Sequence, residues 1–239
     1  MGMVINRLRF LILTLSCLFV AAPVAAQTNE VKVGVIGIFS GPYASWGNEY
    51  RQGVELYLDQ HNGKNGNPKV TVLFRDVGGD NPARARQLAQ ELIVRDKVTL
   101  LGGLEFTPNV LALADLITEA KVPFIAFGSA TAFITDKSPY YIRAAYTQWT
   151  VQTILGKWAI SQGMKRCAIL AADFATGHDS IAAFTHGYTG GTVAEVVRVP
   201  LGTTDISSYL QRVQDANPQS LDVFLPLGPM SVAFFKAFA

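Results

Sequence analysis

The sequence has few side chains that could form a metal site. Its three histidines are His61, His178 and His186, and the last two lie eight residues apart on one predicted helix, with Asp179 as the acid beside them. A structural or catalytic zinc site needs three or four ligands held together. We therefore predict no metal centre, and no other motif in the chain calls for a cofactor.

Nucleophilic or acid–base catalysis finds little support either. Cys167 stands inside a predicted apolar strand, where a buried and unreactive thiol is the usual finding. Asp76 and Asp173 both follow predicted strands and could form a carboxylate pair, but they fall in different halves of the chain. No G-x-S-x-G motif is present. An α/β hydrolase is the weaker alternative, and we predict a protein without enzymatic activity.

The glycine-rich stretch Gly37–Gly47, GIFSGPYASWG, follows the first predicted strand, where many enzymes bind a nucleotide phosphate. Its glycines lack the G-x-G-x-x-G spacing, and the sequence has no G-x-x-x-x-G-K-[ST] motif. Pro42 has no backbone N–H to donate, and Glu49 would repel a phosphate at the start of the next helix. The loop is instead predicted to present Trp46 to a ligand; the alternative is that Trp46 packs under its own helix.

The first 26 residues have the pattern of a cleavable secretion signal. Arg7 and Arg9 precede the apolar run 10–20, and small residues follow up to Ala26. The run is short for a membrane span, and an uncleaved anchor is the alternative. Cleavage would leave one cysteine, so no internal disulfide could form, and would lower the formal net charge from +2 to zero. We predict an exported, soluble protein that does not bind nucleic acid.

The rest of the chain alternates short apolar runs with longer amphipathic runs. The predicted strands are 31–39, 69–75, 98–101, 123–127, 166–171, 192–199 and 221–225. The best-defined helices are 48–62, with Tyr50 and Tyr57 on its inner face, one that Asn81 caps before Pro82, one that Thr107 caps before Pro108, and 147–162. This alternation favours right-handed βαβ units and parallel sheets. We predict an α/β fold with one lobe over residues 27–145 and a second over 146–239.

Several motifs occur in an order that resembles the periplasmic leucine/isoleucine/valine-binding protein family. They are the G-P-x-A-x-x-G loop at 41–47 within the segment 33–66, the D-x-x-x-x-x-P-x-x-A stretch at 76–85, and the S-A-T patch within 122–147. The resemblance implies a type I fold, in which two lobes, each a parallel sheet flanked by helices, close on a solute. It also implies a periplasmic receptor that delivers its solute to the permease of an ABC importer and is a monomer when complete.

The resemblance also implies a set of solute-binding residues. Trp46 and Phe106 would form the aromatic wall, and Ser129-Ala130-Thr131 would hold the solute carboxylate through two hydroxyls and successive backbone N–H groups. The alternative for this patch is a plain helix cap after a strand. From the second lobe, Asp173, Thr176 and Gly228, which follow predicted strands, would complete the site.

The nature of the solute follows from the few charges near these loops. An α-amino acid needs an acid for its ammonium group, and Gln148 stands where some amino-acid receptors carry one; Glu105 and Asp173 are the other acids to consider. Trp46 and Phe106 suit a flat ring. The aromatic carboxylates are therefore the favoured solutes, and branched-chain or other amino acids come next. A ligand-sensing regulatory domain of the same fold is the functional alternative.

The chain departs from the family pattern towards its end. Complete family members cross between the lobes three times, whereas this chain crosses once and stops at an apolar stretch, 234–239. We therefore expect an incomplete second lobe, and exposed sheet edges where the remaining strands would pair.

Overall fold

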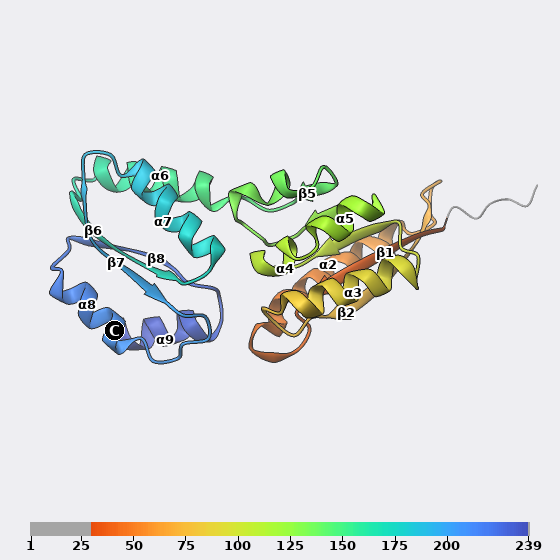
Figure 1. Cartoon of the computed structure of the whole chain (residues 1–239), viewed down its shortest axis with the longest axis horizontal. Coiled ribbons are helices and arrows are strands. Elements are labelled where there is room, and N and C mark those ends of the chain that lie inside the picture. The colour runs from red at the N-terminus through yellow and green to blue at the C-terminus, as the bar shows by residue number, and fades with distance from the viewer. Residues whose placement is uncertain (1–29, 239) are drawn as a thin grey trace, which may run out of the picture.

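The computed structural model describes residues 30–238, which form two parallel sheets flanked by helices (Figure 1). The first sheet contains β1 (Glu30–Gly37), β2 (Lys69–Asp76), β3 (Leu100–Gly103), β4 (Phe124–Ala126) and β5 (Tyr141–Arg143), in the order β2-β1-β3-β4-β5. The second contains β6 (Arg166–Ala172), β7 (Thr192–Val199) and β8 (Ser220–Phe224), in the order β7-β6-β8. The predicted α/β class with parallel sheets is confirmed.

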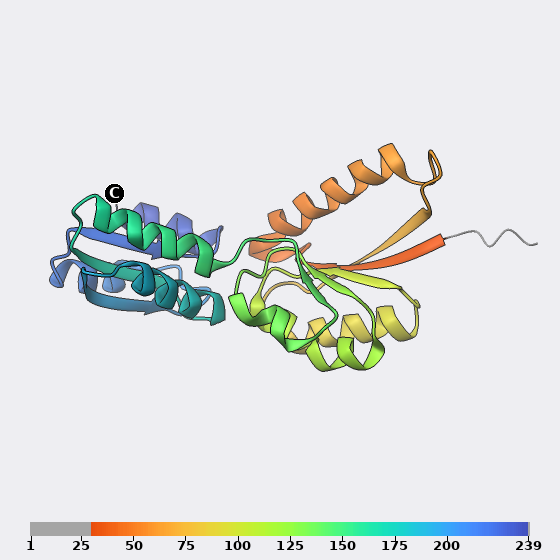
Figure 2. The same cartoon turned by 90° about the horizontal axis from the view of Figure 1, so that it is seen from above.

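The helices cover both faces of each sheet (Figures 1 and 2). They are α2 (Ala44–His61), α3 (Pro82–Val94), α4 (Thr107–Leu111), α5 (Ala114–Ala120), α6 (Gln148–Ser161), α7 (Ala175–Gly187), α8 (Ser207–Asp215) and α9 (Pro229–Phe238), with 3-10 turns η1 (Gly41–Tyr43) and η2 (Ala132–Lys137). Figure 2 shows α2 on one side of the first sheet and α3, α4 and α5 on the other. None of the helices within residues 30–238 is long and apolar enough to cross a membrane.

The register of the first sheet brings three loops to one edge. Ile36 lies opposite Gly103, and Gly103 lies opposite Ala126, so β1, β3 and β4 end side by side. In open α/β sheets, ligands bind at the carboxyl ends of such strands. The loops that follow these three strands therefore define where a site can form.

The core of the first lobe lies between the sheet and α3–α5. Leu88 and Leu92 on α3, Ile117 on α5, and Leu101 and Phe124 on the strands are almost completely buried. Burying each such side chain contributes about 1.5–3 kcal/mol relative to leaving it in water. This apolar layer fixes the strand ends in place.

The predicted start of α3 is confirmed. Asn81 precedes the helix and its Oδ1 accepts a hydrogen bond from the backbone N–H of Arg84 at 3.0 Å, while Pro82 takes the first helical position. Proline has no backbone N–H, and this loses no hydrogen bond at the first helical position because the first N–H groups of a helix have no partner within it.

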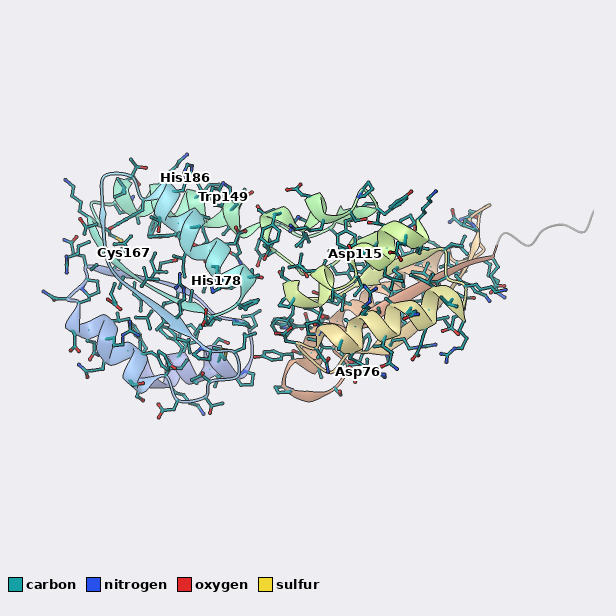
Figure 3. All side chains as sticks on the ribbon, viewed as in Figure 1. Asp76, Asp115, Trp149, Cys167, His178 and His186 are labelled. Atoms are coloured by element: carbon teal, nitrogen blue, oxygen red, sulfur yellow. The ribbon has the colours of Figure 1, made fainter. Side chains whose placement is uncertain are left out.

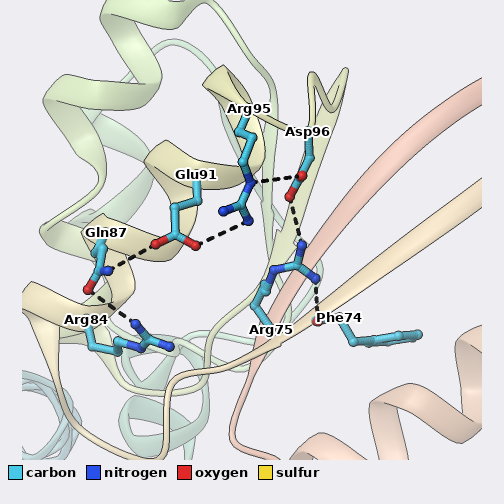
Figure 4. Close-up of polar contacts among 7 residues, drawn as sticks. All are labelled: Phe74, Arg75, Arg84, Gln87, Glu91, Arg95 and Asp96. Atoms are coloured by element: carbon cyan, nitrogen blue, oxygen red, sulfur yellow. Dashed lines mark hydrogen bonds and ion pairs between the residues drawn. The ribbon is translucent and has the colours of Figure 1, made fainter.

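A chain of polar contacts runs along the exposed face of α3 (Figure 4). Glu91 accepts a hydrogen bond from Gln87 at 3.0 Å and faces Arg95 at 3.5 Å; Asp96 then joins Arg95 to Arg75 of β2, the last pair at 2.8 Å. Solvent-exposed ion pairs each contribute about 0–1 kcal/mol. The pairs of Arg95 are of this kind, whereas the pair of Arg75 and Asp96, which ties the end of α3 to β2, is partly buried.

The second lobe distributes its core over both faces of β6 because successive side chains of a strand point to opposite faces. Ala168 and Leu170 face Leu210 of α8 and Phe234 of α9. Cys167 and Ile169 belong to a second cluster, which also contains Ala159 of α6, Phe184 of α7 and Tyr188 directly after α7. The cysteine is buried, as predicted, and burial raises the pKa of its thiol.

Four local predictions differ from the structure. Helix α2 begins at Ala44 rather than at residue 48, and Tyr57, which was predicted to be on its inner face, is 61% exposed. Gly47 is the one α2 residue that is fully buried, so the helix packs by its first turns rather than along a continuous stripe. The helix predicted from Thr107 is divided into α4 and α5. Thr107 is its first residue rather than its cap, because its hydroxyl bonds other threonines.

Residues 144–147 connect β5 of the first sheet to α6 beside the second. The predicted lobe limits at 145 and 146 fall in this connection, and the exact limits stay a prediction. The predicted secretion signal, residues 1–26, lies outside the described residues.

Candidate functional site

A cavity of about 300 Å³ lies where the strand ends of the two sheets face each other. The first lobe contributes the first turns of α2, the loops after β3 and β4, and the chain after β5. The second lobe contributes the start of α6, the loop after β6 with the first turn of α7, and the end of β8 with the loop that follows it. The lining is Trp46, Glu49, Tyr50, Glu105, Phe106, Phe127, Gly128, Ala130, Ala145, Tyr146, Gln148, Phe174, Thr176, Phe224, Leu225, Pro226 and Leu227. Ligand sites of folded proteins typically have this volume range and a predominantly apolar lining.

Aromatic rings from both lobes form the walls. The ring of Phe106 lies 5.7 Å from that of Trp46 and 5.9 Å from that of Phe174, and the ring of Phe174 lies 6.1 Å from that of Phe224. Centroid distances of 4.5–7 Å are those of favourable aromatic pairs. The planar ring of a ligand could therefore pack against these aromatic side chains at similar distances.

The hydroxyls of the Ser129–Thr131 turn are directed away from the cavity. Ser129 Oγ donates to the backbone carbonyls of Glu105 at 3.2 Å and Leu104 at 3.4 Å. Thr131 precedes η2 but makes no side-chain capping bond; its hydroxyl joins Thr107 instead. The two alternatives given for this turn, hydroxyls that hold a carboxylate and a plain helix cap, therefore both differ from the observed hydrogen bonds.

The backbone of this turn has a different arrangement. Arg143 donates to the carbonyl oxygens of Ser129 at 2.7 Å, Thr131 at 2.6 Å and Ala132 at 2.8 Å. The backbone–backbone hydrogen bonds of residues 30–238 include none donated by Ser129, Ala130 or Thr131. The guanidinium thus fixes the turn by its carbonyls and leaves its N–H groups available, with Ala130 at the cavity wall.

Gln148 stands beside this turn. It is the first residue of α6, its backbone N–H donates to the carbonyl of Ala130 at 2.9 Å, and its side chain is 3% exposed and lines the cavity. A side-chain amide carries two N–H donors and one acceptor. The turn and Gln148 together form the neutral, donor-rich part of the cavity.

A buried cluster of three threonines joins the two lobes. The hydroxyl oxygen of Thr107 lies 2.8 Å from that of Thr131 and 2.9 Å from that of Thr176, and the last two are 3.1 Å apart. All three side chains are at most 4% exposed. Next to them, Asp179 of α7 accepts a hydrogen bond from the backbone N–H of Ala132 at 2.8 Å. These contacts hold the second lobe against the loops of the first.

Replacing Thr176 with valine should lower the free energy of unfolding by about 1–3 kcal/mol, because the two remaining hydroxyls lose a buried partner. Chemical denaturation would measure the change. Thr185→Val makes the same substitution at an exposed position of the same helix, α7, and should change stability by less than about 0.5 kcal/mol. Equal effects of the two substitutions would show that the cluster does not stabilise the contact between the lobes.

Two titratable groups in the cavity are strongly affected by burial. Glu105 is 5% exposed, and burial raises the pKa of its carboxyl to about 7, with a smaller increase from the charge of Asp76; the nearby backbone N–H groups of Ile38 and Glu105 offset part of this. Burial, followed by the charge of Glu105, raises the pKa of Tyr50 to about 12. The cavity thus contains a carboxyl that changes charge near neutral pH.

The structure brings four of the eight predicted site residues to the cavity: Trp46, Phe106, Ala130 and Thr176. Their role in binding stays a prediction. Four others are not part of the lining. Ser129 and Thr131 lie behind it, as described above. Asp173 is exposed and pairs with His178 at 2.7 Å, and Gly228 lies against Tyr43 with φ of 126°.

Sequence reasoning overlooked several lining residues. Phe174 directly follows the predicted acid Asp173, and Phe224 and Leu225 end the last predicted strand, so the strand-end rule could have found them. Tyr50 was assigned to the packed face of a helix, and Tyr146 follows the predicted lobe boundary. No local pattern distinguishes these tyrosines from packing or surface residues.

The histidines have separate surroundings (Figure 3). His178 and His186 both belong to α7; the first pairs with Asp173, and the ring of the second stacks on Trp149 of α6 at 5.4 Å. Within residues 30–238, no group of three or more His, Cys, Asp or Glu side chains is placed to hold a metal ion.

Comparison with known proteins places this arrangement in a family. A family model described as periplasmic binding protein matches residues 30–239. The chain belongs to the periplasmic binding protein family. The family implies a periplasmic location.

A curated relative within this family is the Leu/Ile/Val-binding protein homolog 6 of Brucella melitensis, which is 39% identical over 228 residues. The match covers 95% of this chain and 58% of the relative. The predicted resemblance to the Leu/Ile/Val-binding proteins is thus confirmed, and the chain spans less than two thirds of the length of this relative.

Two solved structures have similar folds. A solute-binding protein of an ABC transporter from R. palustris, in complex with 4-hydroxybenzoate, is 42% identical with a TM-score of 0.84; the match covers 87% of this chain and 57% of that one. A second such protein, from Rhodopseudomonas palustris BisB5 in complex with 3,4-dihydroxy benzoic acid, is 38% identical with a TM-score of 0.83, covering 88% and 58%.

Proposed function

We propose that this protein captures an aromatic carboxylate between its two lobes and delivers it to the permease of an ABC importer. The cavity carries the proposal: aromatic rings from both lobes wall it, and the Ser129–Thr131 turn offers free backbone N–H groups on one side. Relatives bound to 4-hydroxybenzoate and 3,4-dihydroxy benzoic acid support the same solute class. Capture needs no bond making or breaking in the solute.

In this mechanism the solute carboxylate lies at the donor-rich part of the cavity. The N–H groups of the turn and the side-chain amide of Gln148 would donate to it. The Arg143 guanidinium supports them from behind by fixing the turn through its carbonyls. Successive backbone N–H groups bind anions without requiring a full positive charge.

The ring of the solute would lie between Trp46, Phe106 and Phe174. Phe174 and Thr176 already contact the first lobe in this structure, so opening of the lobes would have to break the threonine cluster. The energy of these contacts then favours the closed state over the open one, as in other hinged receptors.

A branched-chain amino acid is the second candidate solute. The observation in its favour is the pair of acids in the lining, Glu49 and Glu105, because an ammonium group needs a negative partner. The name of the curated relative also favours it. Both candidates require the same capture mechanism and differ in the polar end of the solute.

Thermal unfolding of the 239-residue chain with a panel of solutes tests the proposal. A solute at about 100 times its dissociation constant adds roughly 2.7 kcal/mol to the stability, which raises the midpoint by roughly 5–10 °C for a chain of this size. We expect this shift with 4-hydroxybenzoate or benzoate and none with benzamide, which keeps the ring but lacks the charge. A shift with leucine alone would favour the second candidate, and no shift with any solute would contradict both.

A further inference from the structure

The side chain of Tyr50 has a packed ring and a hydroxyl without a hydrogen-bond partner among residues 30–238. The residue lines the cavity from the second turn of α2. Its ring meets that of Phe127 edge to face, with centroids 5.4 Å apart and planes at 77°. A tyrosine hydroxyl that is withdrawn from water usually has a hydrogen-bond partner. A ligand in the cavity would supply one.

The Tyr50 hydroxyl lies beside the start of the Ser129–Thr131 turn. A Cβ on Gly128, the residue directly before the turn, would meet Tyr50 Oη at 2.6 Å. Gly128 also lines the cavity, and its N–H donates to the carbonyl of Leu104 at 3.3 Å. The hydroxyl therefore occupies the space that a side chain at position 128 would need.

The hydroxyl is a hydrogen-bond donor at neutral pH. Burial, followed by the charge of Glu105, raises the pKa of Tyr50 to about 12, so Oη keeps its proton. The N–H groups of the neighbouring turn and the side-chain amide of Gln148 are donors in the same cavity. Tyr50 thus adds a neutral O–H group to the donor-rich part of the cavity.

The charged groups near these donors do not exclude an anion. Glu49 is exposed, so water and salt screen its charge. Glu105 is buried against Gly128, burial raises the pKa of its carboxyl to about 7, and the backbone N–H groups of Ile38 and Glu105 lie on that carboxyl. The guanidinium of Arg143, which donates to the carbonyls of the turn, adds a positive charge on the same side of the cavity.

We propose that Tyr50 donates a hydrogen bond to the carboxylate of the solute and thereby helps to select anionic solutes. The inference rests on the proposed function, in which the carboxylate lies at the Ser129–Thr131 turn. A carboxylate has two oxygens that accept hydrogen bonds. The hydroxyl beside Gly128 bonds one of them, while the turn and Gln148 bond the other.

Isothermal titration of the 239-residue chain with benzoate and with 4-hydroxybenzoate tests this role. Tyr50→Phe removes the hydroxyl and keeps the ring against Phe127. We expect it to weaken the binding of both solutes by the same factor, at least about tenfold, because the hydrogen bond to the charged carboxylate is lost. Tyr57→Phe makes the same substitution on the same helix, at a side chain that is 61% exposed, and should bind like the wild type.

A second substitution tests where the hydroxyl lies. Gly128→Ala should weaken binding in the wild type, because the added Cβ would displace Tyr50 Oη. Phenylalanine has no Oη, so the same substitution should cost less affinity in the Tyr50→Phe variant. The two losses should therefore not add, as is usual for residues in contact. Fully additive losses would overturn the contact of the hydroxyl with the carboxylate at this turn.

The outcomes separate this inference from the proposed function. Unchanged binding of both solutes by Tyr50→Phe would overturn the role of Tyr50 while the receptor function stands. A loss confined to 4-hydroxybenzoate would place the Tyr50 hydroxyl at the ring hydroxyl and overturn its contact with the carboxylate. A wild type that binds leucine and neither aromatic solute would overturn the proposed solute class, and weaker leucine binding by Tyr50→Phe would still support the contact. Binding of none of these solutes would overturn both proposals. Circular dichroism of each variant verifies its fold.

Discussion

Replacing Gly47 with alanine should lower the free energy of unfolding by roughly 3 kcal/mol or more. A Cβ at this position would lie 2.2 Å from the carbonyl oxygen and 2.7 Å from the carbonyl carbon of Ile38. Both atoms belong to the backbone of Ile38, which directly follows β1 and cannot move far without disturbing the paired end of that strand. Urea denaturation monitored by circular dichroism would measure the loss.

The same helix offers a matched control. Gly53 also belongs to α2, but a Cβ there would have no atom within 4 Å. Gly53→Ala should stabilise the protein by about 0.5–1 kcal/mol, because alanine is a better helix former and restricts the unfolded chain. If Gly47→Ala were no more harmful than Gly53→Ala, the close approach of α2 to β1 would not contribute to the stability of the fold.

This prediction also concerns the cavity. Gly47 is the last residue of the G-P-x-A-x-x-G loop, and Trp46 next to it lines the cavity. A displaced α2 would move Trp46 and Tyr50 together. We therefore expect any residual folded Gly47→Ala protein to bind its solute more weakly than Gly53→Ala does.

Replacing Asp222 with asparagine should raise the free energy of unfolding at pH 8 by up to roughly 4 kcal/mol. Asp222 is 5% exposed on β8, and its Oδ2 has no hydrogen-bond partner in the described part of the chain. Burial raises the pKa of its carboxyl from the ordinary value of 3.8 to about 7. The folded state must therefore hold an unpaired charge at high pH, and asparagine removes it.

The sign of the pH dependence follows from the direction of this shift. Between pH 3.8 and about 7 the folded state binds more protons at Asp222 than the unfolded state does, so stability falls as the pH rises. The advantage of Asp222→Asn should thus be small near pH 4 and grow up to about pH 8. Burial also raises the pKa of Glu105, and this affects the pH dependence of stability equally in both proteins. The difference in the free energy of unfolding between the variant and the wild type therefore reports on Asp222.

Urea denaturation of both proteins across this pH range provides the measurement. Asp215→Asn, at the exposed end of α8 in the same lobe, should change stability by no more than about 0.5 kcal/mol at any of these pH values. A constant difference between Asp222→Asn and the wild type from pH 5 to pH 8 would show that Asp222 stays charged in the folded protein throughout.

The order of strands and helices could be read from the sequence because local patterns determine it. Asn81 and Pro82 specify the start of α3 by hydrogen-bonding rules that act within four residues. The resemblance to the leucine/isoleucine/valine-binding proteins implied Trp46, Phe106, Ala130 and Thr176 as site residues, and the structure brings these four to one cavity at the edge where the parallel strands end. These inferences do not depend on knowing the hydrogen-bond partner of each side chain in the folded protein.

The orientation of individual groups depended on the tertiary structure. The sequence could not show that Ser129 Oγ donates to backbone carbonyls or that Thr131 joins Thr107 and Thr176, because those partners lie 24 or more residues away. Nor could it show that Glu105 is buried, since the backbone at Leu104 turns in a way that side-chain patterns do not encode. By itself, the sequence determined the family, the parallel α/β architecture and the edge where a solute would lie. The tertiary structure decided which groups reach the cavity, because the direction of a side chain depends on backbone torsions and on distant hydrogen-bond partners.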